Sequence, residues 1–216
     1  MAICYLCPSM WADPDCGLCP RLVSYREQNR RENPDWHNAP AMPFGDLDAR
    51  LLIVGLAPGR TGANRTGRVF TGDSAGRTLF EALLSTGFAI GHYQEMGDDD
   101  LCLMDCVISN AVLCAPPENK PTTEEQATCL PYLTRLIKAM PKLQVIVTLG
   151  DVARRNLLKA LGVSASITSG GHGATVKIGN LLLINSYHCS RYNLNTGRLT
   201  PQTFALIFQT VREHLQ

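Results

Sequence analysis

Four apolar runs along the chain predict buried strands, at residues 51–56, 103–113, 143–149 and 181–185. Helical patterns lie between these runs. We predict helices over residues 21–31, 73–86, 122–140 (with a kink or restart at Pro131) and 151–161, and from Thr200 onward. Because strands alternate with helices, the pattern indicates an α/β fold with a parallel sheet that helices cover on both faces.

In such sheets, ligands bind outside the carboxyl ends of the strands. The segments that follow residues 56, 113 and 184 are therefore the places to look for functional side chains. One charged run, Asp98–Asp100, follows a glycine, and we interpret it as a solvated loop. His172 stands among glycines, and we interpret it as a turn residue.

Composition places this chain among ordinary globular proteins. It has 216 residues, of which 45% are hydrophobic, enough for one large domain and too few for two ordinary ones. We therefore predict a single domain over 1–216, with residues 1–15 as an extension that carries an extra Cys-x-x-Cys pair. The formal net charge of +1 gives no general attraction for a polyanion, so contact with nucleic acid requires a local basic patch.

The N-terminal segment has neither a basic start nor an apolar run before Pro8, so it does not resemble a signal peptide. No stretch approaches the roughly 18 apolar residues that a membrane helix needs. We expect a cytoplasmic protein with no membrane partner, and reduced cysteines.

The segment after the first predicted strand, residues 55–73, is rich in glycine and arginine. It is not a phosphate-binding Walker A loop, because no Gly-Lys-Ser/Thr follows the glycines. Glycines allow the backbone to approach a ligand, arginines suit phosphate oxygens, and Phe70 could stack on a base. The alternative is a surface loop with solvated arginines, in which Asp73 only caps the next helix.

The other two segments also carry polar groups beside apolar strands. Asn110 lies within a strand, either as a satisfied core amide or as a group that reads a base edge with its donor and acceptor. Asn119 is most simply a turn residue. His188, followed by Ser190, Arg191 and Asn193, is either structural or a leaving-group stabiliser beside a phosphate clamp.

Nine cysteines are unusual in a chain of this size. One interpretation is a zinc site made by Cys4, Cys7, Cys16 and Cys19, although the loop between the two pairs is shorter than in zinc ribbons. The other is a four-thiolate iron–sulfur cluster held by Cys16, Cys19, Cys114 and Cys129. The spacing is compatible with both.

Taken together, these segments resemble the iron–sulfur branch of the uracil-DNA glycosylases, and most closely its family 5, the type B enzymes. The resemblance extends from Cys16 to Thr200. It rests on three motifs: residues 55–59 running on to Phe70-Thr71-Gly72-Asp73, Cys114-Ala115-Pro116-Pro117 with Asn119-Lys120-Pro121-Thr122, and His188 through Ser190-Arg191, Asn193 and 196–200.

The resemblance implies a three-layer α/β/α sandwich around a four-stranded, mainly parallel sheet. It also implies a structural [4Fe–4S] cluster on Cys16, Cys19, Cys114 and Cys129, with Cys4 and Cys7 outside the family pattern. Family 4 has a glutamate where this chain has Leu56, and the carboxylate implicated in the type B enzymes maps onto Asp73. Where the type B motif often has histidine, this chain has Thr61. Asn110 matches the uracil-reading asparagine of family 4.

The implied activity is a DNA glycosylase of base-excision repair. It would flip uracil, or another deaminated base such as hypoxanthine, out of DNA and hydrolyse its N-glycosidic bond. With this activity in view, we assign the roles as hypotheses: catalysis by Asp73, Asn119 and His188; base binding by Gly55, Ala57, Phe70 and Asn110; DNA contacts by Arg65, Arg68, Ser190, Arg191, Asn193 and Arg198. We expect a monomer. Two alternatives are an iron–sulfur protein that binds damaged nucleic acid without catalysis, and a zinc-ribbon protein that binds nucleotides.

Overall fold

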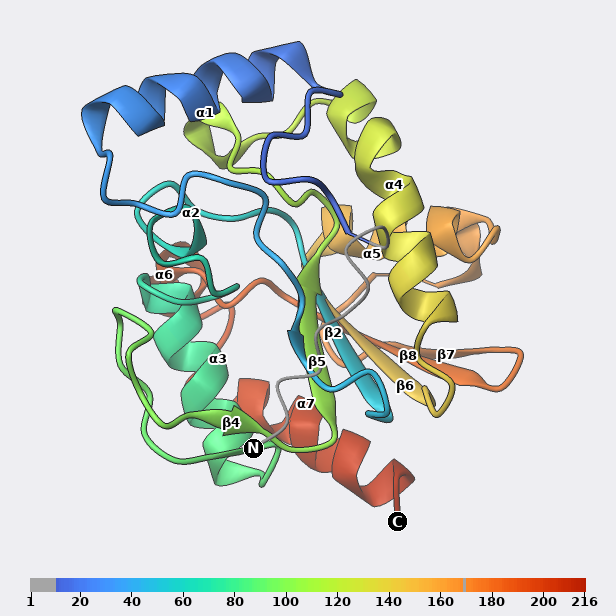
Figure 1. Cartoon of the computed structure of the whole chain (residues 1–216). Helices are drawn as coiled ribbons and strands as arrows, with labels where there is room; N and C mark the ends of the chain where they lie inside the picture. The colour runs from blue at the N-terminus through green and yellow to red at the C-terminus, as the bar shows by residue number, and fades with distance from the viewer. Residues whose placement is uncertain (1–10, 169) are drawn as a thin grey trace.

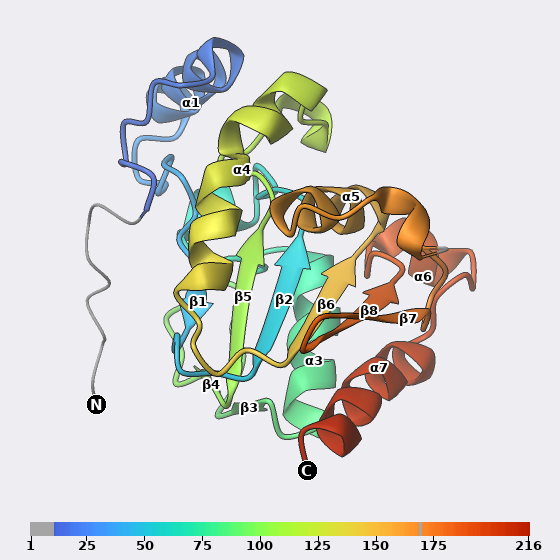
Figure 2. The same cartoon turned by 90° about the vertical axis from the view of Figure 1, so that its right-hand side faces the viewer.

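A computed structural model describes residues 11–168 and 170–216. Its centre is a six-stranded sheet in the order β1-β5-β2-β6-β8-β7 (Figure 1, with all six strands labelled in Figure 2). The four inner strands are parallel: β5 (Cys106–Asn110), β2 (Leu51–Gly55), β6 (Val145–Leu149) and β8 (Leu181–Ser186). These correspond to the four apolar runs, so the predicted α/β fold is confirmed.

The expected count of four strands is wrong, because an antiparallel strand lies at each edge of the sheet. β1 (Phe44–Gly45) pairs with β5, and β7 (Thr175–Ile178) pairs with β8. β1 has only two residues, and β7 alternates exposed and half-buried positions. Neither strand therefore produces the continuous apolar run that marks a strand buried on both faces.

Five helices of ten or more residues agree with the sequence pattern: α1 (Pro20–Glu32), α3 (Ser74–Ser85), α4 (Thr123–Lys138), α5 (Asp151–Ala160) and α7 (Pro201–His214). Thr122 caps α4 in a capping box with Glu125, as expected. Pro131 does not end this helix, which runs through it. Shorter elements are α2 (Ala63–Thr66), α6 (Arg191–Asn195), the turns Pro117–Asn119 and Ala165–Ile167, and a hairpin of β3 (Ala89–Ile90) and β4 (Cys102–Leu103).

Alternate residues of each inner strand face two separate cores, because successive side chains of a strand point to opposite faces. On one face, Leu51 and Ile53 pack with α3 and α7, and on the other, Leu52 and Val54 pack with α4 and α5. Figure 2 shows these two pairs of helices on opposite faces of the sheet. This gives the three layers that the resemblance implies. Among the described residues, no helix is long and apolar enough to cross a membrane.

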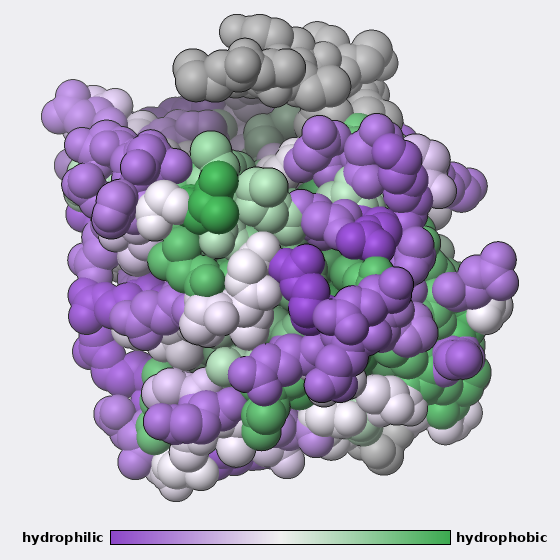
Figure 3. Space-filling view, turned by 90° about the horizontal axis from the view of Figure 1, so that it is seen from below, coloured by the Kyte–Doolittle hydropathy of each residue, from purple (hydrophilic) through white to green (hydrophobic). Residues whose placement is uncertain are grey.

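The inner strands all point toward α1 and the start of α4, so the segments after β2, β5 and β8 meet at that end (Figures 1 and 2). The carboxyl end of the sheet is therefore where the predicted functional segments come together. The opposite end of the molecule, seen from below in Figure 3, shows small hydrophobic groups divided by hydrophilic residues.

Candidate active site

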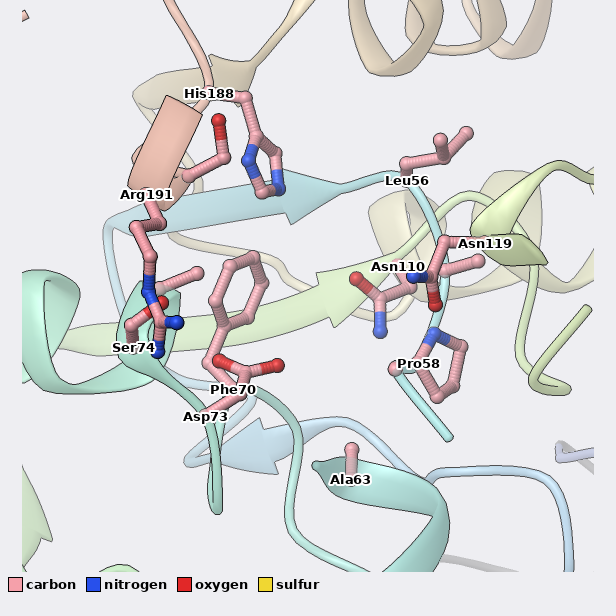
Figure 4. A pocket seen from close by; sticks show the side chains of 14 residues that line it. Leu56, Pro58, Ala63, Phe70, Asp73, Ser74, Asn110, Asn119, His188 and Arg191 are labelled. Carbon is pink, nitrogen blue, oxygen red and sulfur yellow. The ribbon is translucent and has the colours of Figure 1, made fainter. Parts of the chain in front are cut away.

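A pocket of about 360 Å³ opens at the carboxyl ends of β2 and β5 (Figure 4). All three predicted segments contribute to it. Its walls are Leu56, Ala57, Pro58, Gly59, Ala63, Phe70, Asp73, Ser74, Ala75, Asn110, Asn119, His188, Ser190 and Arg191. Residues separated by more than 130 positions in the sequence thus share one cavity.

Gly55, the last residue of β2, lies next to two of the lining residues, Phe70 and Asn110. A Cβ carbon at this position would stand 2.5 Å from Asn110 Oδ1 and 2.6 Å from Phe70 Cζ. Only glycine therefore allows the ring and the amide to lie against the end of the strand. Phe70 itself has the left-handed backbone angle φ 55°, which is strained for a residue with a bulky side chain.

Asn110 is 3% exposed, and its Oδ1 atom is buried with no hydrogen-bond partner. The satisfied-core-amide interpretation is therefore wrong for this oxygen. A buried acceptor that stays unpaired costs about 1–3 kcal/mol. Because the side chain also lines the pocket, a ligand with an N–H group at this place would recover that cost.

Asp73 caps α3 and also lines the pocket, so capping is not its only contact in this structure. One carboxylate oxygen accepts the Gly76 backbone N–H at 2.9 Å. The other lies against the glycine-rich segment: a Cβ carbon on Gly62 would stand 2.6 Å from Oδ2, and one on Gly59 3.1 Å from it. Asn119 approaches from a turn in which it and Glu118 both have left-handed backbone angles.

His188 closes the pocket opposite Asp73. Its backbone carbonyl accepts a hydrogen bond from Asn193 Nδ2 at 2.8 Å, and its ring lies 6.3 Å from the Phe70 ring, centroid to centroid. Burial lowers the pKa of His188 below its ordinary value, against an opposing effect of the Asp73 carboxylate. The imidazole is therefore neutral at pH 7 and can donate an N–H hydrogen bond.

The predicted DNA-contacting residues do not all lie together. Ser190 and Arg191 line the pocket, and Ser190 caps α6 by accepting the Asn193 N–H. Arg198 packs its guanidinium 4.2 Å from the centre of the Tyr187 ring. Tyr192, which sequence reasoning missed, is 72% exposed beside Arg191.

Like Arg198, the other two predicted arginines lie outside the pocket lining. Arg65 directs Nη2 toward the Gly72 carbonyl at 3.4 Å. Arg68 forms an ion pair with Asp99, whose side chain is fully buried. The interpretation of Asp98–Asp100 as a solvated loop is therefore wrong at Asp99. The signal in the sequence that could have revealed the buried Asp99 was the excess of arginines over acidic residues in residues 55–73, the segment that contains Arg68.

A second group of residues gathers four cysteines beside α1. Cys16, Cys19, Cys114 and Cys129 line one small cavity together with Leu22, Val112, Leu113 and Tyr132. In the described part of the chain, no three ligating side chains converge on the position of a single metal ion. A [4Fe–4S] cluster would take one thiolate for each iron, so its four cysteines would not need to share one metal position. Cys4 and Cys7 lie outside the described residues.

Arg26 provides a test of whether these cysteines suit an anionic group. Its side chain is 5% exposed, Nη1 donates to the Cys16 carbonyl at 3.1 Å, and Nε is buried without a hydrogen-bond partner. Glu27 approaches Nε only to 4.0 Å. A buried cation is costly without a compensating anion, and a cluster with four thiolates would supply one. The cysteine set therefore fits the cluster that the resemblance implies.

Comparison with known proteins agrees with this geometry. The family model described as "Uracil DNA glycosylase superfamily" matches residues 42–212. A type-5 uracil-DNA glycosylase of Pyrobaculum aerophilum is 41% identical over 199 residues, covering 90% of this chain and 87% of that protein.

Two further relatives extend the comparison. A type-5 enzyme of Thermus thermophilus is 42% identical over 88% of this chain and 89% of its own length. A type-4 enzyme of Pyrobaculum aerophilum is 35% identical over 68% of this chain and 62% of its own length. The match spans the sheet and every segment that lines the pocket. The chain belongs to the uracil-DNA glycosylase superfamily.

Proposed function

We propose that this protein excises uracil from DNA by hydrolysing the N-glycosidic bond and leaves an abasic site, as a monofunctional glycosylase of base-excision repair. The observation that carries the proposal is the pocket, where Phe70, Asn110, Asp73 and His188 face one cavity. A base inside a duplex is inaccessible, so the nucleotide must flip out at a cost of a few kcal/mol. Stacking on Phe70 and a hydrogen bond to Asn110 would offset that cost.

The base would be recognised by the lactam group on its Watson–Crick edge. Uracil presents an N3–H donor next to the O4 acceptor, and the amide of Asn110 offers the complementary acceptor and donor. The unpartnered Oδ1 atom supports this role. Hypoxanthine carries the same N–H and C=O pair, so this contact alone would also accept that base.

Bond cleavage develops negative charge on the departing base and positive charge on the sugar. A neutral His188 would donate its N–H to the base oxygen, as an oxyanion donor does. Asp73, with Asn119, would stabilise the sugar cation or position the water. The water oxygen bonds to the sugar carbon as the N-glycosidic bond breaks, the base departs with the bonding electrons, and one proton of the water compensates for the charge on the base.

DNA would bind across the mouth of the pocket. Arg191 and Arg198, with Arg65, would contact phosphates and set the register without reading sequence. The exposed ring of Tyr192 next to Arg191 could stack on the opened duplex. Ser190 and Asn193 support this segment through their hydrogen bonds. The ion pair with Asp99 removes Arg68 from the phosphate contacts that we propose.

Cys16, Cys19, Cys114 and Cys129 would hold a [4Fe–4S] cluster with a structural role. When bound, the cluster would join the segment before α1 to both ends of the segment that carries Asn119, which runs between Cys114 and Cys129. The buried, poorly paired cation of Arg26 supports an anionic group at this place.

A single-turnover assay tests the function, with duplex DNA that contains one uracil and a matched thymine duplex as control. We expect abasic sites from the uracil duplex only. Asp73→Asn should slow excision about 10²–10³-fold and leave DNA affinity within about threefold. Tight binding without any product, from iron-replete protein, would favour the non-catalytic binder. Zinc in place of iron would contradict the cluster.

A further inference from the structure

We infer that Arg68 and Asp99 form a positioning unit that holds Phe70 and Asp73 in their working geometry. This inference rests on the proposed function and adds to it two residues that do not line the pocket. Asp99 lies in the segment between β3 and β4, and Arg68 lies two residues before Phe70.

The first observation is the ion pair itself. Arg68 Nη1 and Nη2 donate to the two carboxylate oxygens of Asp99, at 2.6 and 2.7 Å. The Asp99 side chain is 0% exposed and that of Arg68 only 13%. Asp99 also accepts the backbone N–H groups of Gln94 and Leu101. The carboxylate thus stabilises its own loop by accepting these backbone hydrogen bonds, and it also forms the ion pair with Arg68.

The guanidinium of Arg68 is enclosed by aromatic rings. Its central carbon lies 5.4 Å from the Phe44 ring centre, 5.5 Å from that of Phe80 and 5.9 Å from that of Tyr93. The Phe80 and Tyr93 rings stack on each other at 4.8 Å. A guanidinium that is packed against rings and paired in two places has little freedom to move.

The second observation is that this unit reaches the catalytic segment through separate contacts. Arg68 Nε donates to Thr71 Oγ1 at 2.8 Å, and the Gly72 N–H donates to the Tyr93 hydroxyl at 3.3 Å. Thr71 and Gly72 are the two residues between Phe70 and Asp73. The two residues that join Phe70 to Asp73 are therefore held by groups that the Asp99 loop supplies or orients.

The strain at Phe70 explains why such support is needed. A left-handed backbone at a bulky residue costs of order 1–3 kcal/mol and persists only where the surroundings enforce it. On its other side the segment abuts α3, where a Cβ carbon on Gly76 would stand 1.7 Å from the Phe70 carbonyl oxygen. Helix α3 and the Arg68–Asp99 pair hold the segment between them.

The test compares Asp99→Asn with Arg77→Ala, which removes an exposed ion pair to Glu95 in the same region. We expect Asp99→Asn to slow single-turnover uracil excision at least tenfold, with DNA affinity within threefold, because small misplacements of reacting groups have large rate effects. Arg77→Ala should leave the rate within twofold. A rate of Asp99→Asn equal to that of the wild type would overturn the inference.

A milder pair of variants covers the case in which Asp99→Asn does not fold. Thr71→Val removes the hydroxyl that Arg68 contacts and preserves the side-chain shape, whereas Thr71→Ser retains the hydroxyl. We expect slow excision from Thr71→Val and recovery in Thr71→Ser. Equal rates for the two variants would contradict the inference.

Coupling to Asp73 separates positioning from general destabilisation. In the Asp73→Asn background, adding Asp99→Asn should cost far less than it does in the wild type. Fully additive losses would overturn the positioning role.

Hydrogen exchange gives a readout without excision: Asp99→Asn should speed exchange in residues 69–74 and leave α5 unchanged. If the wild-type protein excises no uracil, the proposed function is wrong. The positioning role of Arg68 and Asp99 would still be tested by whether Asp99→Asn speeds exchange in residues 69–74.

Discussion

Arg21, in the first turn of α1, donates hydrogen bonds from Nε and Nη2 to the two carboxylate oxygens of Glu125, in the first turn of α4, at 2.8 and 2.7 Å. Its Nη2 also donates to the carbonyl of Lys120 at 3.0 Å. Lys120 follows Asn119 directly. One arginine therefore joins the cysteine-bearing end of α1 to the turn that presents a proposed catalytic amide.

Removing this arginine should affect both stability and excision. Arg21→Ala leaves the poorly exposed Glu125 carboxylate without its cation, and we expect a loss of about 2 kcal/mol in the free energy of unfolding. Excision should slow because the Asn119 turn loses an anchor. Urea titration and single-turnover rates measure the two effects. Lys142→Ala, which removes an exposed pair with Asp48, is the control and should cost less than about 1 kcal/mol.

Gly55→Ala should damage the pocket sterically. The added carbon would overlap the Phe70 ring and the Asn110 amide, so both must move. We expect excision to fall by about 10²-fold, and unfolding free energy to fall by about 1–3 kcal/mol from overpacking. Affinity for duplex DNA without uracil should not change, which separates the pocket from the DNA-binding surface. Normal excision by this variant would contradict the close packing described above.

Asn110→Ala should reduce activity more than stability. The variant removes a buried acceptor that has no partner in the free protein, so the free energy of unfolding should change by less than about 1 kcal/mol. Excision of uracil should fall about 5- to 150-fold with the lost hydrogen bonding. Asn185→Ala is a matched control: that buried amide accepts from Thr148 and donates to Thr168, so its removal should be clearly destabilising. Equal destabilisation by the two variants would rule out the recognition role.

The stability of the protein should depend on pH through His188. Its pKa is lowered in the folded state, chiefly by burial, from an ordinary value of 6.5. In the unfolded chain His188 therefore binds a proton at a higher pH than in the folded protein. Its contribution to stability is complete above 6.5 and is lost as the pH falls from 6.5 toward the lowered value. Urea titrations at pH 7.5, 6.5 and 5.5 give the free energy of unfolding of wild type and His188→Gln. The difference between the two proteins should change with pH, and a constant difference would contradict this prediction.

The cysteine assignment predicts a selective loss of iron. Cys129→Ser should lose the brown colour and most of the iron, about four atoms per chain in the wild type for a [4Fe–4S] cluster. Cys102→Ser is the control, because Cys102 is exposed on β4 and away from the cysteine cavity. Iron counts and visible absorbance after anaerobic purification decide the matter. Full iron retention by Cys129→Ser would contradict the ligand set.

Much of the fold was predictable because its signals are local. The inner strands are buried on both faces, so each appears as an unbroken apolar run, and Asp73, Thr122 and Thr200 cap helices where short-range hydrogen-bonding rules expect caps. The same rules missed β1 and β7, since short or half-exposed edge strands leave no such run.

The sequence by itself also determined which loops line the candidate pocket, because parallel strands bring their carboxyl ends to one edge. Only the tertiary structure decided which polar side chains are free to act. Arg68 and Arg191 look alike in sequence, yet one is paired with a buried Asp99 and the other lines the pocket. Local pattern cannot distinguish them, because the partner that takes up the charge of Arg68 lies 31 residues away along the chain. Pairing and desolvation depend on distances in space, and these arise only when the chain is folded.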